Sequence, residues 1–263
     1  MVDERKPEPG KGRDYVLKTL ENGLSVLKLF SPSESCLSLK TMDEKLHLGK
    51  SRTFKLVRTL VKAGFLRENF PERGYVLGPA VVALGLLALG QMDVRRLARP
   101  ILAELAQATQ ETAILTMLNG ESSVVIDKVD SPHSVRMAAE LGSRGVLHAG
   151  GSSVPLLAFG PEVLRQKFLS GGVPLTRFTE NTATTVQALD DLLRKVRANG
   201  YHVSKEEVER DIMAVGAPVL DRRRVATLCV SVAGPIHRME VREEAIIKEV
   251  VGAANKLGSL LAV

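Results

Sequence analysis

The chain has 263 residues, 44% of them hydrophobic and 25% charged, so it can bury a core and is not a disordered protein. Its longest apolar stretch, Pro79 to Gly90, is shorter than the roughly 20 residues that cross a bilayer, and residues 1–14 lack the apolar segment of a signal peptide. Two cysteines, Cys36 and Cys229, are too few for a disulfide framework or a four-thiolate zinc site. We therefore expect a soluble, cytoplasmic protein with one large domain or two smaller ones.

The net charge of +6 is concentrated in the first part of the chain. Residues 1–78 hold 15 Lys and Arg against 10 Asp and Glu, whereas residues 79–263 hold 21 against 20. Six cations lie between Lys50 and Arg67, and no acid lies among them. This distribution predicts a polyanion as partner of the first part only. Aromatic residues make up 4% of the chain, which argues against a platform for stacking single-stranded bases or RNA.

Residues 15–78 predict three helices and a hairpin. The polar leader before them, residues 1–14, is expected to be disordered. Apolar residues recur at helical spacing in three stretches, and the third stretch stops at Gly64, as a helix C-terminus commonly does. Two extended runs on either side of Pro71 to Gly74 have the pattern of a hairpin. The helices are expected at residues 15–30, 39–46 and 50–63, and the hairpin strands at residues 65–67 and 75–77.

The third predicted helix carries different side chains on its two faces. Leu56 and Leu60 lie on one face, whereas Arg52, Lys55 and Lys62 share the opposite face, because residues three or four apart are neighbours on a helix. A charged stripe is also what an ordinary solvated helix would present, and charge alone does not decide between the two. The absence of any acid over 18 residues favours a winged helix-turn-helix that binds DNA.

The remaining residues predict an α+β domain with a mainly antiparallel sheet covered by helices. Residues 79–110 are expected to be helical, and we expect the apolar run from Pro79 to Gly90 to pack against a second copy of the chain. From Thr112 the hydrophobic period changes to that of strands. Strands are predicted at residues 113–118, 124–129, 135–139, 214–220 and 225–232, and helices near residues 151–159, 161–170, 186–199 and 241–261.

The chain resembles the IclR-type bacterial transcription regulators over residues 15–262. Several blocks occur in the order and at the approximate spacing of that family, and the ordered set is far more specific than any single block. The blocks are LSLKTMDEKLHLGKSRTFKLVRTLVKAGFL and GYVLG in the amino part, and VIDKVDSPHSVRM, LGSRGVLHAG, ANGYHVSKEEVE, GAPVLD and SVAGPIHR in the carboxyl part.

The resemblance implies a winged helix-turn-helix at residues 15–78, a linker helix and dimer contact at residues 79–92, and an effector-binding domain similar to GAF and PAS domains at residues 93–263. It implies a transcription regulator that binds a palindromic operator in double-stranded DNA as a homodimer or homotetramer and responds to a small-molecule effector. The residues expected to bind DNA are Lys50, Ser51, Arg52, Thr53, Lys55, Arg58, Arg67 and Arg73.

The resemblance also places an effector cleft in the carboxyl part. Small and hydroxylic side chains there suit a small organic acid. Gly150 and Gly151 precede a predicted helix and would leave backbone N–H groups free for a carboxylate. The same glycines would equally allow a strand and a helix to pack tightly, and the sequence leaves both readings open. The residues expected at the effector are Met137, His148, Gly151, Ser152, Ser204, Ala214, Ser231 and Ala233.

Several positions depart from the residues that are usual in the family. Asp43 and His47 stand where Ala and Gly are usual, and Gly49 replaces a Pro that would pre-organise the start of the helix. Residues 52–55 read Arg-Thr-Phe-Lys where Thr-Val-His-Arg is frequent, so we expect a different operator. Ala214 replaces a frequent Cys near the effector cleft.

The sequence contains no pattern that predicts catalysis, a metal site or a cofactor. The five histidines are scattered, and HExxH, CxxC, GxSxG and P-loop motifs are absent. Cys229 lies in an apolar strand and is expected to be an inert thiol, and the acidic run from Glu206 to Glu209 is expected to be a solvated loop. The alternative function is a ligand-sensing or enzymatic GAF-like protein whose helix-turn-helix mediates protein contacts. The acid-free basic helix favours the DNA-binding regulator.

Overall fold

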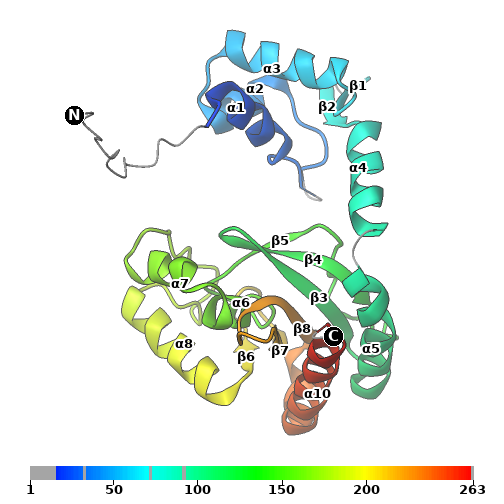
Figure 1. Ribbon diagram of the computed structural model, residues 1–263, viewed down its shortest axis with the longest axis vertical. Coiled ribbons are helices and arrows are strands. Elements are labelled where there is room, and N and C mark those ends of the chain that lie inside the picture. Colours follow the sequence, from blue (N-terminus) through cyan, green and yellow to red (C-terminus); the bar gives the residue numbers. More distant parts are fainter. Residues whose placement is uncertain (1–15, 32–33, 71–72, 91–92, 262–263) are drawn as a thin grey trace, which may run out of the picture. The chain divides into compact units, whose positions relative to one another are not determined.

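The computed structural model describes residues 16–31, 34–70, 73–90 and 93–261 (Figure 1). The leader predicted to be disordered, residues 1–14, lies outside these ranges. The chain divides into two compact units, with the boundary between Ala88 and Leu89, and each unit has its own hydrophobic core. Within the described ranges, no helix is long and apolar enough to cross a membrane.

The first unit is a winged helix-turn-helix. Its core is formed by apolar residues from its first three helices and both strands of the hairpin, among them Val26, Met42, Leu56, Leu66 and Tyr75. The three predicted helices and the hairpin are confirmed, although the first helix is shorter than expected. The elements are α1 (Lys18–Leu27), α2 (Leu39–Leu46), α3 (Lys50–Lys62), β1 (Leu66–Asn69) and β2 (Gly74–Leu77), followed by α4 (Pro79–Gly90).

The turn between α2 and α3 uses two left-handed residues. His47 ends α2 with φ 51°, and Gly49 is the N-cap of α3 with φ 86°. This backbone region is free for glycine but costs energy for other residues. His47 therefore adopts a conformation that a glycine would adopt more easily, and Gly49 supplies no side chain to cap α3.

The wing is a short antiparallel hairpin in which Leu66 lies opposite Leu77. A third segment joins it, because Leu37 and Tyr75 exchange two backbone hydrogen bonds of 2.9 and 3.0 Å. The contact leaves no room for a side chain at Gly74, where a Cβ atom would lie 2.4 Å from Cys36 Sγ. The start of β2 is thus attached directly to the core of the first unit, because Leu37 and Tyr75 both belong to that core.

The second unit contains a six-stranded antiparallel sheet in the order β5-β4-β3-β8-β7-β6. Helices α5 and α10 cover one face of the sheet, and α6 and α8 cover part of the other (Figure 1). The strands are β3 (Thr112–Asn119), β4 (Ser122–Val129), β5 (Arg144–Val146), β6 (His202–Lys205), β7 (Ile212–Leu220) and β8 (Ala226–Pro235). The helices are α5 (Asp93–Thr109), α6 (Val154–Phe159), α7 (Glu162–Leu169), α8 (Val186–Asn199), α9 (Ile236–Met239) and α10 (Glu243–Leu261), with a 3-10 turn at Glu240–Arg242.

The α+β fold class is confirmed, but the strand predicted at residues 135–139 is wrong. Residues 130–143 form a loop between β4 and β5. The alternating apolar pattern has another cause: Met137 and Ala139 pack in a small cluster with Ile114 and Ala233, while Val135 is exposed. The short strands β5 and β6 were not predicted, because three or four residues carry too little periodicity to be recognised.

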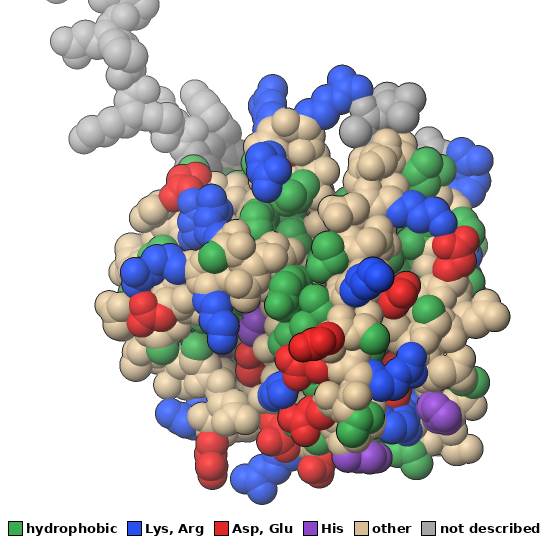
Figure 2. All heavy atoms as spheres, turned by 90° about the horizontal axis from the view of Figure 1, so that it is seen from below, with side chains coloured by type: hydrophobic (Ala, Val, Ile, Leu, Met, Phe, Trp, Pro, Cys, Tyr) green, Lys and Arg blue, Asp and Glu red, His purple; other side chains and the backbone are tan. Residues whose placement is uncertain are grey.

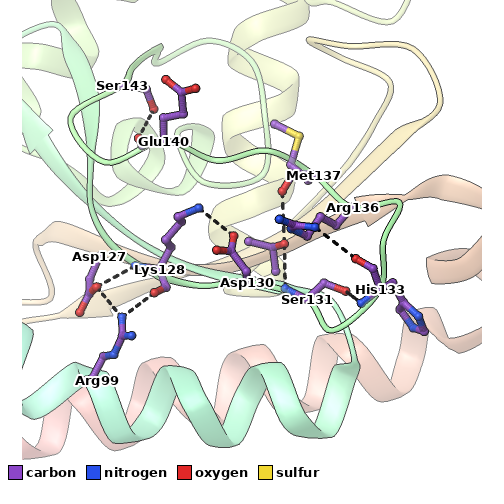
Figure 3. Close-up of polar contacts among 11 residues, drawn as sticks. Arg99, Asp127, Lys128, Asp130, Ser131, His133, Arg136, Met137, Glu140 and Ser143 are labelled. Carbon is purple, nitrogen blue, oxygen red and sulfur yellow. Dashed lines mark hydrogen bonds and ion pairs between the residues drawn. The ribbon is translucent and has the colours of Figure 1, made fainter. Parts of the chain in front are cut away.

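A β-bulge in β4 changes the faces on which its side chains lie. Leu115 lies opposite Asp127 but Thr116 lies opposite Val125, so Ile126 is the extra residue. Asp127 therefore lies on the α5 side of the sheet, where it is 4% exposed and accepts a 2.9 Å hydrogen bond from Arg99 (Figure 3). Beyond the bulge, Val125 lies on the opposite side, together with Thr116.

A second buried carboxylate joins the sheet to the segment after β8. Both oxygens of Glu111, which is 4% exposed, accept hydrogen bonds from Arg238, at 2.6 and 2.7 Å. This pairing raises the pKa of the Arg238 guanidinium. Gly234 makes room for the pair, since a Cβ atom there would lie 2.3 Å from Glu111 Oε2.

Candidate DNA-binding surface and effector cavity

The first turns of α3 present an exposed cationic surface. Lys50, Arg52 and Lys55 are exposed, and none of them forms an ion pair with another described residue. Together with Ser51 they border an open hollow of ≈ 490 Å³ at the start of the helix. The N-terminus of a helix attracts anions through its free N–H groups and its dipole, and the three cations add to this effect.

Two other residues predicted to bind DNA have partners within the protein. The Thr53 side chain is 1% exposed and donates a 2.8 Å hydrogen bond to Asp43 Oδ1, so the expectation that Thr53 contacts DNA through its side chain is not supported. Arg58 pairs with Glu68 on β1 at 3.0 Å, with both side chains partly exposed. The Asp43 that departs from the family's usual Ala therefore joins α2 to α3.

The two predicted wing residues lie on the hairpin. Arg67 on β1 and Arg73 just before β2 are both exposed. Arg73 has a φ of 50° and so holds a long cationic side chain at a left-handed position, which usually favours glycine, asparagine or aspartate. The wing thus carries two cations in addition to those of α3.

The second unit contains a cavity of ≈ 340 Å³ on the sheet face opposite α5 and α10. It is lined by residues from all six strands of the sheet, from the β4–β5 loop, from the turn before α6 and from the loop between β6 and β7. Six of the eight residues predicted at the effector line it. They are Met137, Gly151, Ser152, Ser204, Ala214 and Ala233.

The other two predicted effector residues lie behind the cavity wall. His148 is buried, with Nε2 2.9 Å from the Thr176 carbonyl oxygen and its ring stacked on Phe178. Ser231 is fully buried, and its Oγ lies 2.7 Å from Ser152 Oγ. Ser231 therefore positions Ser152, whereas His148 holds the segment that leads into the turn before α6.

The backbone N–H of Gly150, which was expected to be free for a carboxylate, is occupied. It donates a 2.8 Å hydrogen bond to Glu207 Oε2, and Glu207 Oε1 lies 2.9 Å from His202 Nε2. The helix α6 begins only at Val154. At Gly151 a Cβ atom would lie 2.8 Å from the Ala214 carbonyl oxygen, so the glycine permits close packing of the turn on β7. Of the two readings left open by the sequence, tight packing is the one that the structure supports at Gly151.

The β4–β5 loop brings Met137 to the cavity and is held at several points (Figure 3). Thr112 Oγ1 donates to the Met137 carbonyl oxygen at 3.3 Å, and Ser131 Oγ donates to the Gln110 carbonyl oxygen at 2.7 Å. At the far end, Ser143 Oγ donates to the Glu140 carbonyl oxygen at 2.7 Å. These bonds position a segment that lacks regular structure.

Sequence reasoning missed the wall formed by β3 and β4. Ile114, Thr116, Ser123 and Val125 line the cavity from these strands. On each strand the two residues are two positions apart, so the sequence alone indicates that they lie on the same face of the sheet. Which side of the sheet they face was not visible, because the bulge at Ile126 shifts the register within β4.

Cys229 is buried in β8 of the second unit. Burial raises the pKa of the Cys229 thiol, so the group stays protonated and is a poor nucleophile. In the part of the chain that the structure describes, no three His, Cys, Asp or Glu side chains are grouped so that they could hold a metal ion.

On the face drawn in Figure 2, acidic and basic side chains lie side by side around a central band of hydrophobic ones. That face therefore differs from α3, where cations predominate.

A winged helix-turn-helix with an exposed cationic helix, joined to an α+β domain that encloses a ligand-sized cavity, defines a DNA-binding regulator with a sensor domain. Two family models match the chain: the IclR helix-turn-helix domain over residues 19–69 and the bacterial transcriptional regulator IclR C-terminal domain over residues 86–259. The chain belongs to the IclR family of bacterial transcriptional regulators. It is a DNA-binding transcription regulator with a C-terminal effector-binding domain, and the family is one of regulators and not of enzymes.

Individual relatives cover nearly the whole chain. The chain is 29% identical over 242 residues to the HTH-type transcriptional regulator BhcR of Paracoccus denitrificans (strain Pd 1222). These residues make up 92% of this chain and 86% of the relative. Two crystal structures share the fold. An IclR-type regulator from Silicibacter sp. TM1040 has a TM-score of 0.84 at 24% identity, covering 93% of this chain and 96% of that one. An IclR homolog from Microbacterium hydrocarbonoxydans, complexed with 4-hydroxybenzoate, has a TM-score of 0.73 at 23% identity, covering 92% and 98%.

Proposed function

We propose that the chain binds palindromic operators in double-stranded DNA through α3 and the wing, and that a small organic acid bound in the cavity of the second unit modulates this binding. The observation that carries the DNA part is the group of unpaired, exposed cations on the first turns of α3. Such a regulator acts where the DNA is, which for a bacterial protein is the cytoplasm. The cavity and its hydroxyl groups support the effector part.

At the operator, Arg52 and Lys55 are the residues that we assign to base edges in the major groove, since the second helix of the motif reads DNA from its first turns. Lys50 and Ser51 lie at the helix start and are assigned to phosphate. Arg67 and Arg73 on the wing are assigned to phosphate or the minor groove, and Arg58 to phosphate in competition with Glu68.

The DNA part is tested by selecting binding sites from random double-stranded DNA with the full chain. We expect a palindromic consensus, bound with a steep dependence on salt because phosphate contacts release counterions. A double variant Arg52→Ala with Lys55→Ala should abolish the selection. The matched control is Lys40→Ala on α2, where the lysine is exposed and pairs with Glu44. Equal loss in both variants would contradict the assignment to α3.

We propose a dimer, or a tetramer built from dimers, because one helix-turn-helix contacts too few base pairs for useful specificity. The observation that supports self-association is α4, on which Val82, Leu84, Leu86 and Leu87 are exposed. Exposed apolar side chains on one short helix favour burial against another chain. Sedimentation at micromolar concentration without DNA should show a dimer or tetramer. A monomer would disprove this proposal.

We propose that the acid is held by hydroxyl groups and not by the Gly150 N–H, which Glu207 occupies. Ser152 and Ser204 line the cavity, and a hydroxyl that donates to a charged oxygen contributes about 1.5–3 kcal/mol. Two such bonds, after the cost of association, lead us to expect micromolar affinity. The 4-hydroxybenzoate bound by the Microbacterium homolog is an acid of suitable size.

A thermal-shift screen of small organic acids tests the effector. We expect at least one acid to raise the Tm of the parent, to lose this effect in Ala233→Leu, which fills the cavity, and to keep it in Ala198→Leu, which lies exposed on α8. The hit should also change operator affinity, to the extent that it binds one DNA-competent arrangement of the regulator better than another. If no acid raises the Tm of the parent, the effector is not an acid.

A further inference from the structure

One hydroxyl group on the cavity wall has no partner. Thr116 lines the cavity and is 1% exposed, and its Oγ1 atom makes no hydrogen bond to any described residue. Buried hydroxyl groups in folded proteins are nearly always hydrogen-bonded, since an unpaired one loses its contacts with water and gains nothing in return. The Thr116 hydroxyl therefore has the capacity to bind a group that enters the cavity.

Two further hydroxyl groups, those of Ser123 and Ser153, line the same cavity as Thr116. The bulge sets Thr116 opposite Val125, so Ser123 is its diagonal neighbour on the same face of the sheet, about 7–8 Å away. Ser123 Oγ and Ser153 Oγ lie 2.7 Å apart. One hydroxyl proton lies between those two oxygens, and the second proton remains available for another acceptor.

Gly145 packs closely on the Ser123–Ser153 pair, and the cavity wall around the pair is otherwise apolar. A Cβ atom at Gly145 would lie 2.7 Å from Ser123 Oγ and 3.0 Å from Ser153 Oγ, so a larger residue there would press on the pair. Ile114, Val125 and Ala139 supply apolar surface along the same wall. This end of the cavity therefore combines an apolar wall with hydroxyl groups that have unused hydrogen-bonding capacity.

We propose that Thr116 forms a subsite for an oxygen of the effector. The subsite selects a ligand with a compact apolar body, such as an aromatic or alicyclic ring, that carries a hydroxyl or carbonyl group. This inference rests on the proposed function in assuming that the cavity binds the effector. It is separate from the proposal that the effector is an acid, because the oxygen bound by Thr116 need not belong to a carboxylate.

The first test uses the protein without ligand. Thr116→Val removes only the unpaired hydroxyl, so we expect the Tm to rise by about 2–4 °C. The matched control is Thr109→Val, because Thr109 is equally buried but donates a 2.7 Å hydrogen bond to the Leu105 carbonyl oxygen. The Tm of the control should fall. A fall for Thr116→Val of the same size would show that its hydroxyl has a partner and would overturn the subsite.

The second test compares ligands that differ by one hydroxyl group. Two pairs are titrated against the full chain: benzoate with 4-hydroxybenzoate, and the neutral toluene with p-cresol. The parent should bind the hydroxylated member of a pair about tenfold more tightly. In Thr116→Val the two members of a pair should bind with about equal affinity, and the member without the hydroxyl should bind as tightly as it does to the parent. Thr116→Ser should keep the preference for the hydroxylated member.

The outcomes separate the two proposals. If only the neutral pair binds and its hydroxyl preference is lost in Thr116→Val, the acid effector is wrong and the subsite stands. If the acids bind without a hydroxyl preference, or keep the preference in Thr116→Val, the acid effector stands and the subsite is wrong. Failure of all four compounds to bind the parent would overturn the subsite as assigned.

Discussion

The two units differ in where they leave polar groups uncompensated. In the first unit the exposed cations on the first turns of α3, Lys50, Arg52 and Lys55, have no carboxylate partners among the described residues, while the Thr53 and Asp43 side chains are paired with each other. In the second unit the buried charges are paired, as Glu111 is with Arg238, and the unpaired hydroxyl of Thr116 lies on a cavity wall. Each unit thus has polar groups without partners where its ligand is proposed to bind. In the first unit they are cations on the surface of α3, and in the second unit the group is a hydroxyl on the cavity wall.

The largest effect is expected from breaking the buried ion pair of the second unit. Arg238→Met leaves the Glu111 carboxylate buried without a partner, which we expect to cost about 3 kcal/mol of stability. The contrasting variant in the first unit is Arg58→Met, whose partner Glu68 is partly exposed, and the expected cost is about 0–1 kcal/mol. Urea unfolding of both full-length variants measures the difference. Equal costs would contradict the contrast between the two units.

The next largest effect concerns the outer face of α3. Arg52→Ala should weaken operator binding by about 1–3 kcal/mol if the guanidinium reads a guanine, and it should relax the preference at one base pair. Competition binding with the selected operator and with operators mutated at single positions measures both quantities. A loss that is the same on every DNA sequence would reassign Arg52 to a phosphate contact.

The sequence predicted more about the first unit than about the second for a physical reason. The helices and the wing of the first unit follow from local signals, such as the helix stop at Gly64 and the acid-free run from Lys50. In the second unit, six of the eight expected effector residues do line one cavity. The strand predicted at residues 135–139 and the free N–H of Gly150 failed because both depend on distant partners, a cluster around Ile114 and the Glu207 carboxylate.

Thr53 separates two roles that a residue of α3 can have. Because its hydroxyl donates to Asp43, Thr53→Val should lower the stability of the first unit by about 1–2 kcal/mol while leaving the preferred operator sequence unchanged. Thermal unfolding and the site selection described for the parent measure the two effects. The control is Ser51→Ala, an exposed neighbour on the same turn that should leave stability nearly unchanged. A changed operator preference in Thr53→Val would show that the helix reads DNA from a different face.

The smallest effect is expected at the wing, where a cation is assigned to the DNA backbone and not to base edges. Arg73→Gln removes one positive charge from an exposed position without disturbing a described ion pair. The slope of log K against log salt should therefore fall by about one, and affinity should fall by a similar factor on all DNA sequences. The left-handed backbone at Arg73 adds a separate expectation, because Arg73→Gly should produce the same change in slope and relieve backbone strain, so that the wing itself stays folded. If the slope and the affinity of both variants equal those of the parent, the wing does not touch DNA, and the binding surface of the first unit is confined to α3.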